Sequence, residues 1–320
     1  MEHAIGAGSL PTKLDLLLSM VSAGTTGTHF VVTATAPPLE RDWSELPVDA
    51  LSSVFAKLAA VEILMGAGLV CRSWLQAAGL PELWRSVDMA GHRLVEAMDS
   101  DDALRAMAIM AVDRSGGQLE VFVRKRFVND EFLKYMGDRA SSLKRLHLIS
   151  CNGVSNAGLA EAVTKFRLLE ELVISLFSNV NERFVFETVG KSCPKLTHFR
   201  LNKNSIHRYG CSTSYKDKEA MGIATMTELS SLRLFGCSLT NAGLTAILDS
   251  CPLLEALDIR YSFNIKEDDT LREKCAGLKA LRLPEDSIDD YEFQDQLPIW
   301  GNLPFYVIDL ISDDDDDFGI

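Results

Sequence analysis

The chain lacks two features that would place it in a membrane or in an oxidising compartment. No unbroken apolar run reaches the roughly 20 residues that a membrane-spanning helix needs, so we expect no membrane span. The seven cysteines are an odd number, and none of them forms a Cys-x-x-Cys or Cys/His pair with metal-ligand spacing. We therefore expect no metal site, and we predict a location in the nucleus, the cytoplasm or both, where thiols stay reduced.

Catalytic motifs are also absent. The chain has no Gly-x-Ser-x-Gly, no His-Glu-x-x-His and no glycine-rich phosphate loop that ends in Lys-Ser or Lys-Thr. Its six histidines are scattered without partners in the sequence. The sequence therefore predicts a binding protein and not an enzyme, and no cofactor is expected.

The chain also has no excess of basic over acidic residues. The formal net charge is −13, but residues 284–320 contain twelve Asp or Glu and no Lys or Arg, so the rest of the chain is almost balanced. Because no basic stripe is available for a phosphate backbone, nucleic acid is not an expected partner. Residues 1–42 are mostly apolar and rich in Thr and Ser, and we interpret them as a flexible leader, the alternative being a processed targeting segment.

Residues 43–89 have the periodicity of a small helical module. The i, i+3, i+4, i+7 spacing of one helical face is kept by Leu51, Val54, Phe55 and Leu58. Pro47 suits the first turn of that helix, and further helical runs are predicted over residues 61–70 and 71–78. Three helices in so short a segment are marginal on their own, so we expect part of their apolar surface to contact a partner.

Two of the four tryptophans, Trp74 and Trp84, lie ten residues apart in the second half of this module. A module of this size has little interior for two indole rings. We therefore predict a core that is shared with the partner, with Trp74 inside the helices and Trp84 nearer the contact. The alternative is that both rings are ordinary core residues of the module.

The remainder of the chain is repetitive. A Leu-x-x-Leu-x-Leu pattern and its close variants begin at Leu143, Leu169, Leu196, Leu229, Leu254 and Leu278, with a degenerate earlier copy at Leu119. Successive starts lie 24 to 33 residues apart, and the letters NAGL open helical periodicity at residues 156–159 and 241–244. Each unit is therefore predicted to be a strand followed by an amphipathic helix. Stacked units predict an α/β fold, a curved solenoid with parallel strands inside and helices outside.

Five of the cysteines occupy equivalent positions of these units. Cys151 and Cys237 each lie eight residues after a repeat start, whereas Cys193, Cys251 and Cys275 each lie three residues before one. We interpret them as small buried side chains at equivalent turns of the solenoid.

The N-terminal module resembles an F-box, through which substrate receptors dock onto the Skp adaptor of cullin–RING ubiquitin ligases. The resemblance rests on Leu46 and Pro47 and on the stretches LSSVFAKL, LVCRSW and PELWRSVDM, in that order. The solenoid resembles the cysteine-containing leucine-rich repeats that commonly follow an F-box. RDWSELP, LMGAGLVCRSW, LDSCPLLEALDIR and DDYEF resemble a plant F-box/leucine-rich-repeat subfamily, and the resemblance covers about residues 41–293.

The resemblance implies the substrate receptor of an SCF ubiquitin ligase, bound to the Skp adaptor and through it to cullin and RING subunits. The alternative is a repeat scaffold that binds the adaptor without presenting a substrate for degradation. The implied segments are a leader (1–42), an F-box (43–89), a helical linker (90–118), six to seven repeats (119–283) and an acidic tail (284–320). The expected adaptor contacts are Leu46, Pro47, Leu51, Val54, Phe55, Leu69, Val70, Cys71, Trp74, Leu83 and Trp84.

Side chains between the repeat leucines are expected on the concave face, because neighbours along a strand alternate between its two sides. The predicted substrate-binding residues there are Arg145, His147, His198, Arg200, Arg233, Asp258, Arg260 and Arg282. They predict a net basic groove for an acidic or phosphorylated segment of an unknown protein substrate. The alternative is a solvated strand surface with no binding role.

Three interpretations of the acidic tail stay open. Val307, Ile308, Leu310 and Ile311 precede five aspartates, and residues 307–317 resemble a SUMO-interacting motif, in which a short apolar strand joins a sheet edge. Alternatively, the acidic residues could fold back onto the basic groove. The third interpretation is a disordered, solubilising tail.

Overall fold

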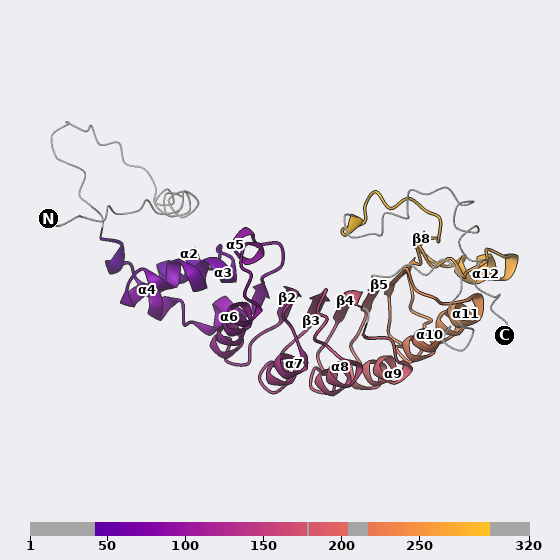
Figure 1. Ribbon diagram of the computed structural model, residues 1–320, viewed down its shortest axis with the longest axis horizontal. Helices are drawn as coiled ribbons and strands as arrows, with labels where there is room; N and C mark the ends of the chain where they lie inside the picture. The colour runs from indigo at the N-terminus through magenta and orange to yellow at the C-terminus, as the bar shows by residue number, and fades with distance from the viewer. Residues whose placement is uncertain (1–41, 178, 204–216, 295–320) are drawn as a thin grey trace, which may run out of the picture.

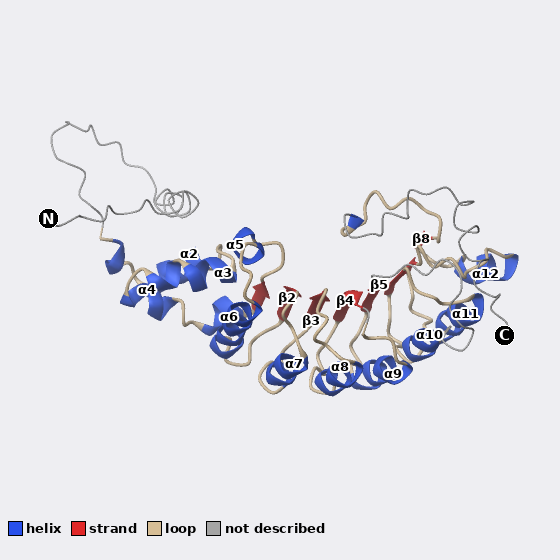
Figure 2. Cartoon of the chain, in the orientation of Figure 1, coloured by secondary structure: helices blue, strands red, loops and turns tan. Residues whose placement is uncertain are grey.

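The computed structural model describes residues 42–177, 179–203 and 217–294. A helical N-terminal part continues into a curved stack of strands and helices (Figure 1). The strands line one side of the curve, and the helices α7 to α11 line the other (Figure 2). This arrangement confirms the predicted α/β solenoid.

The N-terminal part consists of short helices packed on one another and on the start of the sheet. Its elements are η1 (Trp43–Glu45), α2 (Val48–Phe55), α3 (Ala60–Met65), η2 (Ala67–Leu69), α4 (Arg72–Ala77), η3 (Pro81–Trp84), α5 (Arg93–Glu96) and α6 (Asp101–Arg114). The helix predicted over residues 61–70 is interrupted, because the chain leaves helical geometry at Gly66, where φ is −137° and ψ is −85°. It therefore forms α3 and η2 as two separate turns.

The sheet contains eight strands in sequence order, and all neighbouring strands are parallel. They are β1 (Ser86–Asp88), β2 (Val121–Lys125), β3 (Arg145–Ile149), β4 (Glu171–Phe177), β5 (His198–Lys203), β6 (Ser231–Phe235), β7 (Ala256–Asp258) and β8 (Ala280–Arg282). β1 lies within residues 43–89, the segment expected to form the N-terminal module, and it pairs with β2 of the first repeat. The sheet therefore begins before the leucine-rich repeats.

The outer helices follow the strands at the predicted period. They are α7 (Asp130–Gly137), α8 (Asn156–Val163), α9 (Arg183–Ser192), α10 (Lys218–Ile223), α11 (Asn241–Ser250) and α12 (Asp269–Cys275). The repeat leucines are buried up to β7; Leu146, Leu172 and Leu232, for example, are at most 1% exposed. Leu278 and Leu281 of the last repeat are half-buried. One continuous apolar core thus runs through the described chain from the N-terminal helices to α12.

The cysteines at equivalent positions are buried and free, which confirms their predicted packing role. The thiols of Cys151 and Cys251 lie 3.1 and 3.4 Å from backbone carbonyls of the preceding unit, those of Arg126 and Met226. Burial raises the pKa of the Cys151 thiol to about 12 and that of Cys251 to about 11. These thiols therefore stay protonated at neutral pH and act as small apolar fillers with a weak donor.

The NAGL letters encode contacts between successive units. The Oδ1 atom of Asn156 accepts hydrogen bonds from the backbone N–H groups of Asn181 and Glu182 in the next unit, at 3.0 and 3.1 Å. Asn241 repeats this contact with the N–H of Lys266 at 2.8 Å. Each asparagine therefore satisfies backbone donors that would otherwise be unpaired at the edge of the following loop.

The glycine of each NAGL makes room for a carboxylate of the preceding unit. Asp130 accepts hydrogen bonds from the N–H and hydroxyl of Ser155 at 2.8 and 2.6 Å, and Asp217 accepts the equivalent bonds from Thr240. A Cβ atom at Gly158 would overlap the carboxylate of Asp130, and a Cβ at Gly243 would overlap that of Asp217. Only glycine permits this close approach.

We predict that G158A and G243A each lower the free energy of unfolding by about 1–3 kcal/mol, because the added methyl group must displace a bonded carboxylate. The matched control is G277A, at which an added Cβ meets no atom within 4 Å. It should change stability by less than about 0.5 kcal/mol. Urea unfolding of the full chain measures all three, and equal effects would contradict the explanation.

Candidate protein-docking surfaces

The N-terminal helices expose a group of apolar side chains, which we call the apolar face: Met65, Leu69, Val70 and Leu75. They are 42%, 70%, 48% and 49% exposed, and they make up half of the large exposed apolar side chains among the described residues. Apolar side chains gathered in this way on a surface mark contact sites for other proteins.

Glycines shape the turn that carries the apolar face. A Cβ atom placed on Gly66 would lie only 2.9 Å from the carbonyl oxygen of Glu62. A Cβ atom placed on Gly68 would lie only 2.8 Å from the carbonyl oxygen of Ile63. The absence of a Cβ at both positions lets η2 fold tightly against α3, which leaves Leu69 in solvent. Among the other predicted adaptor contacts, Pro47 is exposed, while Leu46, Cys71 and Leu83 are half-buried.

Both tryptophans lie inside the chain's own core. Trp74 is 1% exposed, its Nε1 donates to the carbonyl of Trp43 at 2.9 Å, and its ring meets that of Phe55 edge-on. Trp84 is 0% exposed, and its Nε1 donates to the carbonyl of Ala78 at 2.9 Å. The guanidinium of Arg114 lies 5.2 Å from its ring centroid.

The prediction that Trp74 lies inside the helices is confirmed, whereas the prediction of a core shared with a partner is wrong for these rings, because the chain itself buries Trp84 as well. The module is not isolated: α6 packs against α3 and η3, and β1 joins the sheet, so the chain itself closes the core. Five predicted adaptor contacts are buried by this packing, which leaves them no surface for a partner: Leu51, Val54, Phe55, Trp74 and Trp84.

The concave face carries the predicted row of polar side chains. The strand register aligns His147, Val173, Arg200, Arg233, Asp258 and Arg282 across β3 to β8. His147 Nε2 lies 3.0 Å from Glu171 Oε1, and this contact lowers the pKa of the Glu171 carboxyl. An acidic neighbour that the prediction of a basic groove left out therefore contacts part of the row.

Residues 284–294, which we call the strap, pack against the last repeats. The ring of Tyr291 is 3% exposed and stacks on that of Phe235, with centroids 3.9 Å apart and an angle of 5°. The first part of the segment predicted as an acidic tail is therefore held against the repeats, because its aromatic side chain anchors it to β6. The beginning of the acidic segment does fold back onto the basic residues, as one of the three interpretations expected.

The strap neutralises the C-terminal end of the concave face. Asp290 lies 2.5 Å from Arg260 Nη1 and 3.9 Å from Arg282 Nη2, and the bond from Arg260 lowers its pKa. Glu292 lies 3.7 Å from Arg233, which also pairs with Asp258 at 3.0 Å.

The predicted net basic groove is therefore wrong at this end. Arg260 is 1% exposed and pairs with Asp258 at 2.8 Å, so these two predicted substrate contacts form part of the strap's support. The cations that remain are nearer the middle of the sheet. Arg145 is exposed and Arg200 half-buried, and among the described carboxylates none lies within ion-pair distance of either side chain.

Two absences hold for the residues that the structure describes. No group of three or more His, Cys, Asp or Glu side chains is arranged to hold a metal ion. None of the described helices has both the length and the apolar character that crossing a membrane requires.

Comparisons with known proteins match both the N-terminal module and the repeats. The F-box-like family model matches residues 43–90. F-box protein SKIP19 of Arabidopsis thaliana is 38% identical over 280 residues, which cover 86% of this chain and 87% of that protein. Putative F-box/LRR-repeat protein 22 of Arabidopsis thaliana is 39% identical over 256 residues, 79% of this chain and 80% of the relative. The chain belongs to the F-box/leucine-rich-repeat family.

Two further matches differ in extent. Putative F-box/LRR-repeat protein 23 of Arabidopsis thaliana is 41% identical over 254 residues, and this F-box/leucine-rich-repeat chain spans 55% of its length. Among solved structures, a chain in the crystal structure of the Rad7 and Elc1 complex in yeast matches with a TM-score of 0.42 and 14% sequence identity. That match covers 74% of this chain and 65% of the other.

Sequence reasoning missed two members of the apolar face, Met65 and Leu75. Both lie outside the apolar stripe by which their helices face the core. An apolar residue outside such a stripe is a sequence signal for a contact surface. Sequence reasoning also missed the aromatic anchor of the strap, for which Tyr291 between acidic residues was the signal. The SUMO-interacting residues predicted at Val307, Ile308, Leu310 and Ile311 lie outside the described residues.

The strap yields a prediction about Tyr291. Its buried hydroxyl has no hydrogen-bond partner in the structure, so Y291F should be at least as stable as the wild type. Y291A removes the stacked ring and should destabilise the C-terminal repeats by about 3–5 kcal/mol. Hydrogen exchange of the amides of residues 284–294 and urea unfolding check both, and a Y291A strap that is as protected as the wild type would contradict the anchoring role.

Proposed function

We propose that the chain is the substrate-recognition subunit of an SCF ubiquitin ligase. The apolar face binds the Skp adaptor, and the concave face binds a protein substrate for ubiquitination and proteasomal degradation. The observation that carries the proposal is the exposure of Met65, Leu69, Val70 and Leu75 within the F-box-like module. The transfer chemistry would belong to the cullin and RING subunits, so this chain acts as a non-catalytic receptor.

The adaptor contact follows from the free energy of apolar burial. Fully burying a Leu, Val or Met side chain contributes about 1.5–3 kcal/mol relative to leaving it in water. Leu69 is 70% exposed and has the most to gain, with Val70 and Leu75 beside it. Pro47 and the half-buried Leu46 precede α2. The segment just before them is held on α4, because the hydroxyl of Ser73 in α4 donates a hydrogen bond to the carbonyl of Ser44.

The substrate contact is proposed for the part of the concave face that the strap leaves open. Arg145 lies there in β3 and Arg200 in β5, with β4 between them. Cations that have no ion-pair partner among the described residues favour a segment of opposite charge. A substrate with an acidic or phosphorylated segment fits these side chains. SUMO binding by the C-terminal residues and a nuclear or cytoplasmic location remain predictions.

A non-degradative scaffold is the second candidate, because adaptor binding alone would suit both functions. The two differ in the fate of the bound protein. Proteins that co-purify with the full chain under proteasome inhibition should gain lifetime when the chain is depleted, if it is a ligase receptor. Unchanged lifetimes of all such proteins would favour the scaffold.

The adaptor contact is tested by L69D combined with V70D. Both side chains are exposed, so the free energy of unfolding should change by less than about 0.5 kcal/mol. Binding of a purified Skp adaptor should weaken by at least about 100-fold, because charge replaces the centre of an apolar contact. The matched control is L253D, which changes a 54% exposed leucine on the repeats and should bind normally. Wild-type affinity in the double variant would overturn the assignment.

The substrate contact is tested by R145E combined with R200E. Charge reversal should abolish capture of client proteins by the full chain under proteasome inhibition, while adaptor binding stays unchanged. The matched control is R167E, at an exposed arginine in the turn between α8 and β4. Clients retained by the double variant would show that this part of the concave face is not the substrate site.

A further inference from the structure

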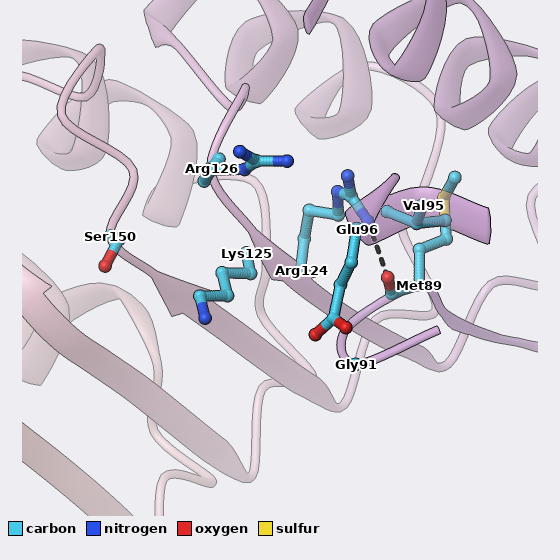
Figure 3. Close-up of a pocket in the computed structure, with 8 residues that line it drawn as sticks. All are labelled: Met89, Gly91, Val95, Glu96, Arg124, Lys125, Arg126 and Ser150. Carbon is cyan, nitrogen blue, oxygen red and sulfur yellow. Dashed lines mark hydrogen bonds between the residues drawn. The ribbon is translucent and has the colours of Figure 1, made fainter. Parts of the chain in front are cut away.

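A second basic site lies at the opposite end of the sheet from the strap. A cavity of about 460 Å³ opens where β2 ends, between that strand and the loop that leads from β1 into α5 (Figure 3). Its volume is typical of pockets that hold a small ligand or a single functional group. Arg124, Lys125 and Arg126 line it in succession, together with Ser150 from the loop after β3.

Arg124 is the unusual member of this site. Its side chain is 0% exposed, and its Nη1 donates to the carbonyl of Met89 at 2.6 Å (Figure 3). The guanidinium also lies 4.2 Å from the ring centroid of Phe127. Its Nε and Nη2 are buried without a hydrogen-bond partner in the described structure. Burial lowers the pKa of this guanidinium to about 10, so it remains charged at neutral pH. Buried donors on a cation are costly unless an acceptor reaches them.

The two residues that follow add charge that nothing in the described chain neutralises. Neither the ammonium of Lys125 nor the guanidinium of Arg126 makes an ion pair or a hydrogen bond among the described residues. Arg126 leaves the strand with a φ of 66°, and Ser150 beside the cavity has a φ of 52°. The equivalent residues of other units, Leu176, Gly236 and Tyr261, have the same left-handed φ, so this conformation belongs to the turn of the repeat.

One carboxylate, that of Glu96, also lines the cavity, with its side chain alongside Arg124 (Figure 3). It is not within ion-pair distance of any of the three cations. Asp88 and Asp101 act on Arg124 from farther away and raise its pKa only as lesser contributions. The cavity therefore keeps a net positive charge. Arg233, Arg260 and Arg282 at the other end of the sheet differ, because carboxylates of the strap hold them.

We propose that this cavity binds a phosphate group, with Arg124 at its base and the side chains of Lys125, Arg126 and Ser150 around the phosphate oxygens. A phosphate dianion suits the site better than a carboxylate, because its several acceptor oxygens match multiple donors and its charge offsets more than one cation. A phosphorylated serine or threonine of a protein and a small phosphorylated molecule carry this same group. The site goes beyond the proposed ligase function and does not depend on adaptor binding.

Titration of the full chain with inorganic phosphate tests the site, by calorimetry and by the thermal unfolding midpoint. We expect saturable binding and a midpoint that rises with phosphate. K125Q combined with R126Q should weaken the affinity at least about tenfold, because two charge-assisted hydrogen bonds are lost. R167Q, a change of an exposed arginine elsewhere, should bind as the wild type does. E96Q should tighten binding a few-fold, because it removes the opposing charge.

R124M separates a ligand site from a structural role. An apolar side chain of similar length replaces a buried charge with unmatched donors, so the variant should be at least as stable as the wild type and yet lose phosphate binding. Absence of saturable binding at about 10 mM phosphate, or equal binding by the wild type and the K125Q/R126Q variant, would overturn the proposal.

A phosphoserine peptide and its unphosphorylated form then identify the source of the phosphate. Tighter binding of the phosphopeptide than of inorganic phosphate, lost in K125Q/R126Q, supports a protein ligand. Phosphate binding without added affinity for the peptide supports a small phosphorylated molecule. Adaptor binding, measured on the same variants, should stay unchanged, so failure of this site and failure of the proposed ligase function are distinguishable.

Discussion

A single repeat of this solenoid cannot bury its own apolar side chains, so every unit depends on the two beside it. The parallel strand ladder, the repeat leucines and the inter-repeat bonds of Asn156 and Asn241 all serve this contact between units. A stack of this kind has two ends whose apolar surfaces need covering. The N-terminal helices cover one end through β1 and α6, and the strap covers the concave side at the other.

The way the ends are covered also decides which surfaces remain for partners. Because α6 and β1 complete the core around Trp84, the N-terminal module has no need of a partner to bury its tryptophans. Its unburied apolar side chains are those of the apolar face, which points outward from α3, η2 and α4. At the far end, carboxylates of the strap form ion pairs with the guanidinium groups of Arg233 and Arg260. Among the described residues, cations without an ion-pair partner lie in the middle of the concave face and beside β2.

Much of the fold and part of the site follow from sequence patterns. The repeat period, the buried cysteines and the order of module and repeats could be predicted, because local periodicity decides which side chains face a core. The row from His147 to Arg282 could be predicted for the same reason, since strand neighbours alternate. The burial of Trp84 by the chain itself and the pairing of Asp290 with Arg260 could not. Those depend on segments that are distant along the chain, and local patterns carry no information about them.

The sequence by itself determined the architecture, a helical module followed by a parallel-stranded solenoid, through spacings of 3.6 and 2 residues and a period of about 25. Tertiary structure alone decided which apolar and charged side chains are free to bind. Whether Leu69 is in solvent or Trp84 in the core, and whether Arg124 or Arg260 finds a counter-ion, depends on which distant group packs against it. Long-range packing distributes burial and charge neutralisation among residues that the sequence alone presents as equivalent.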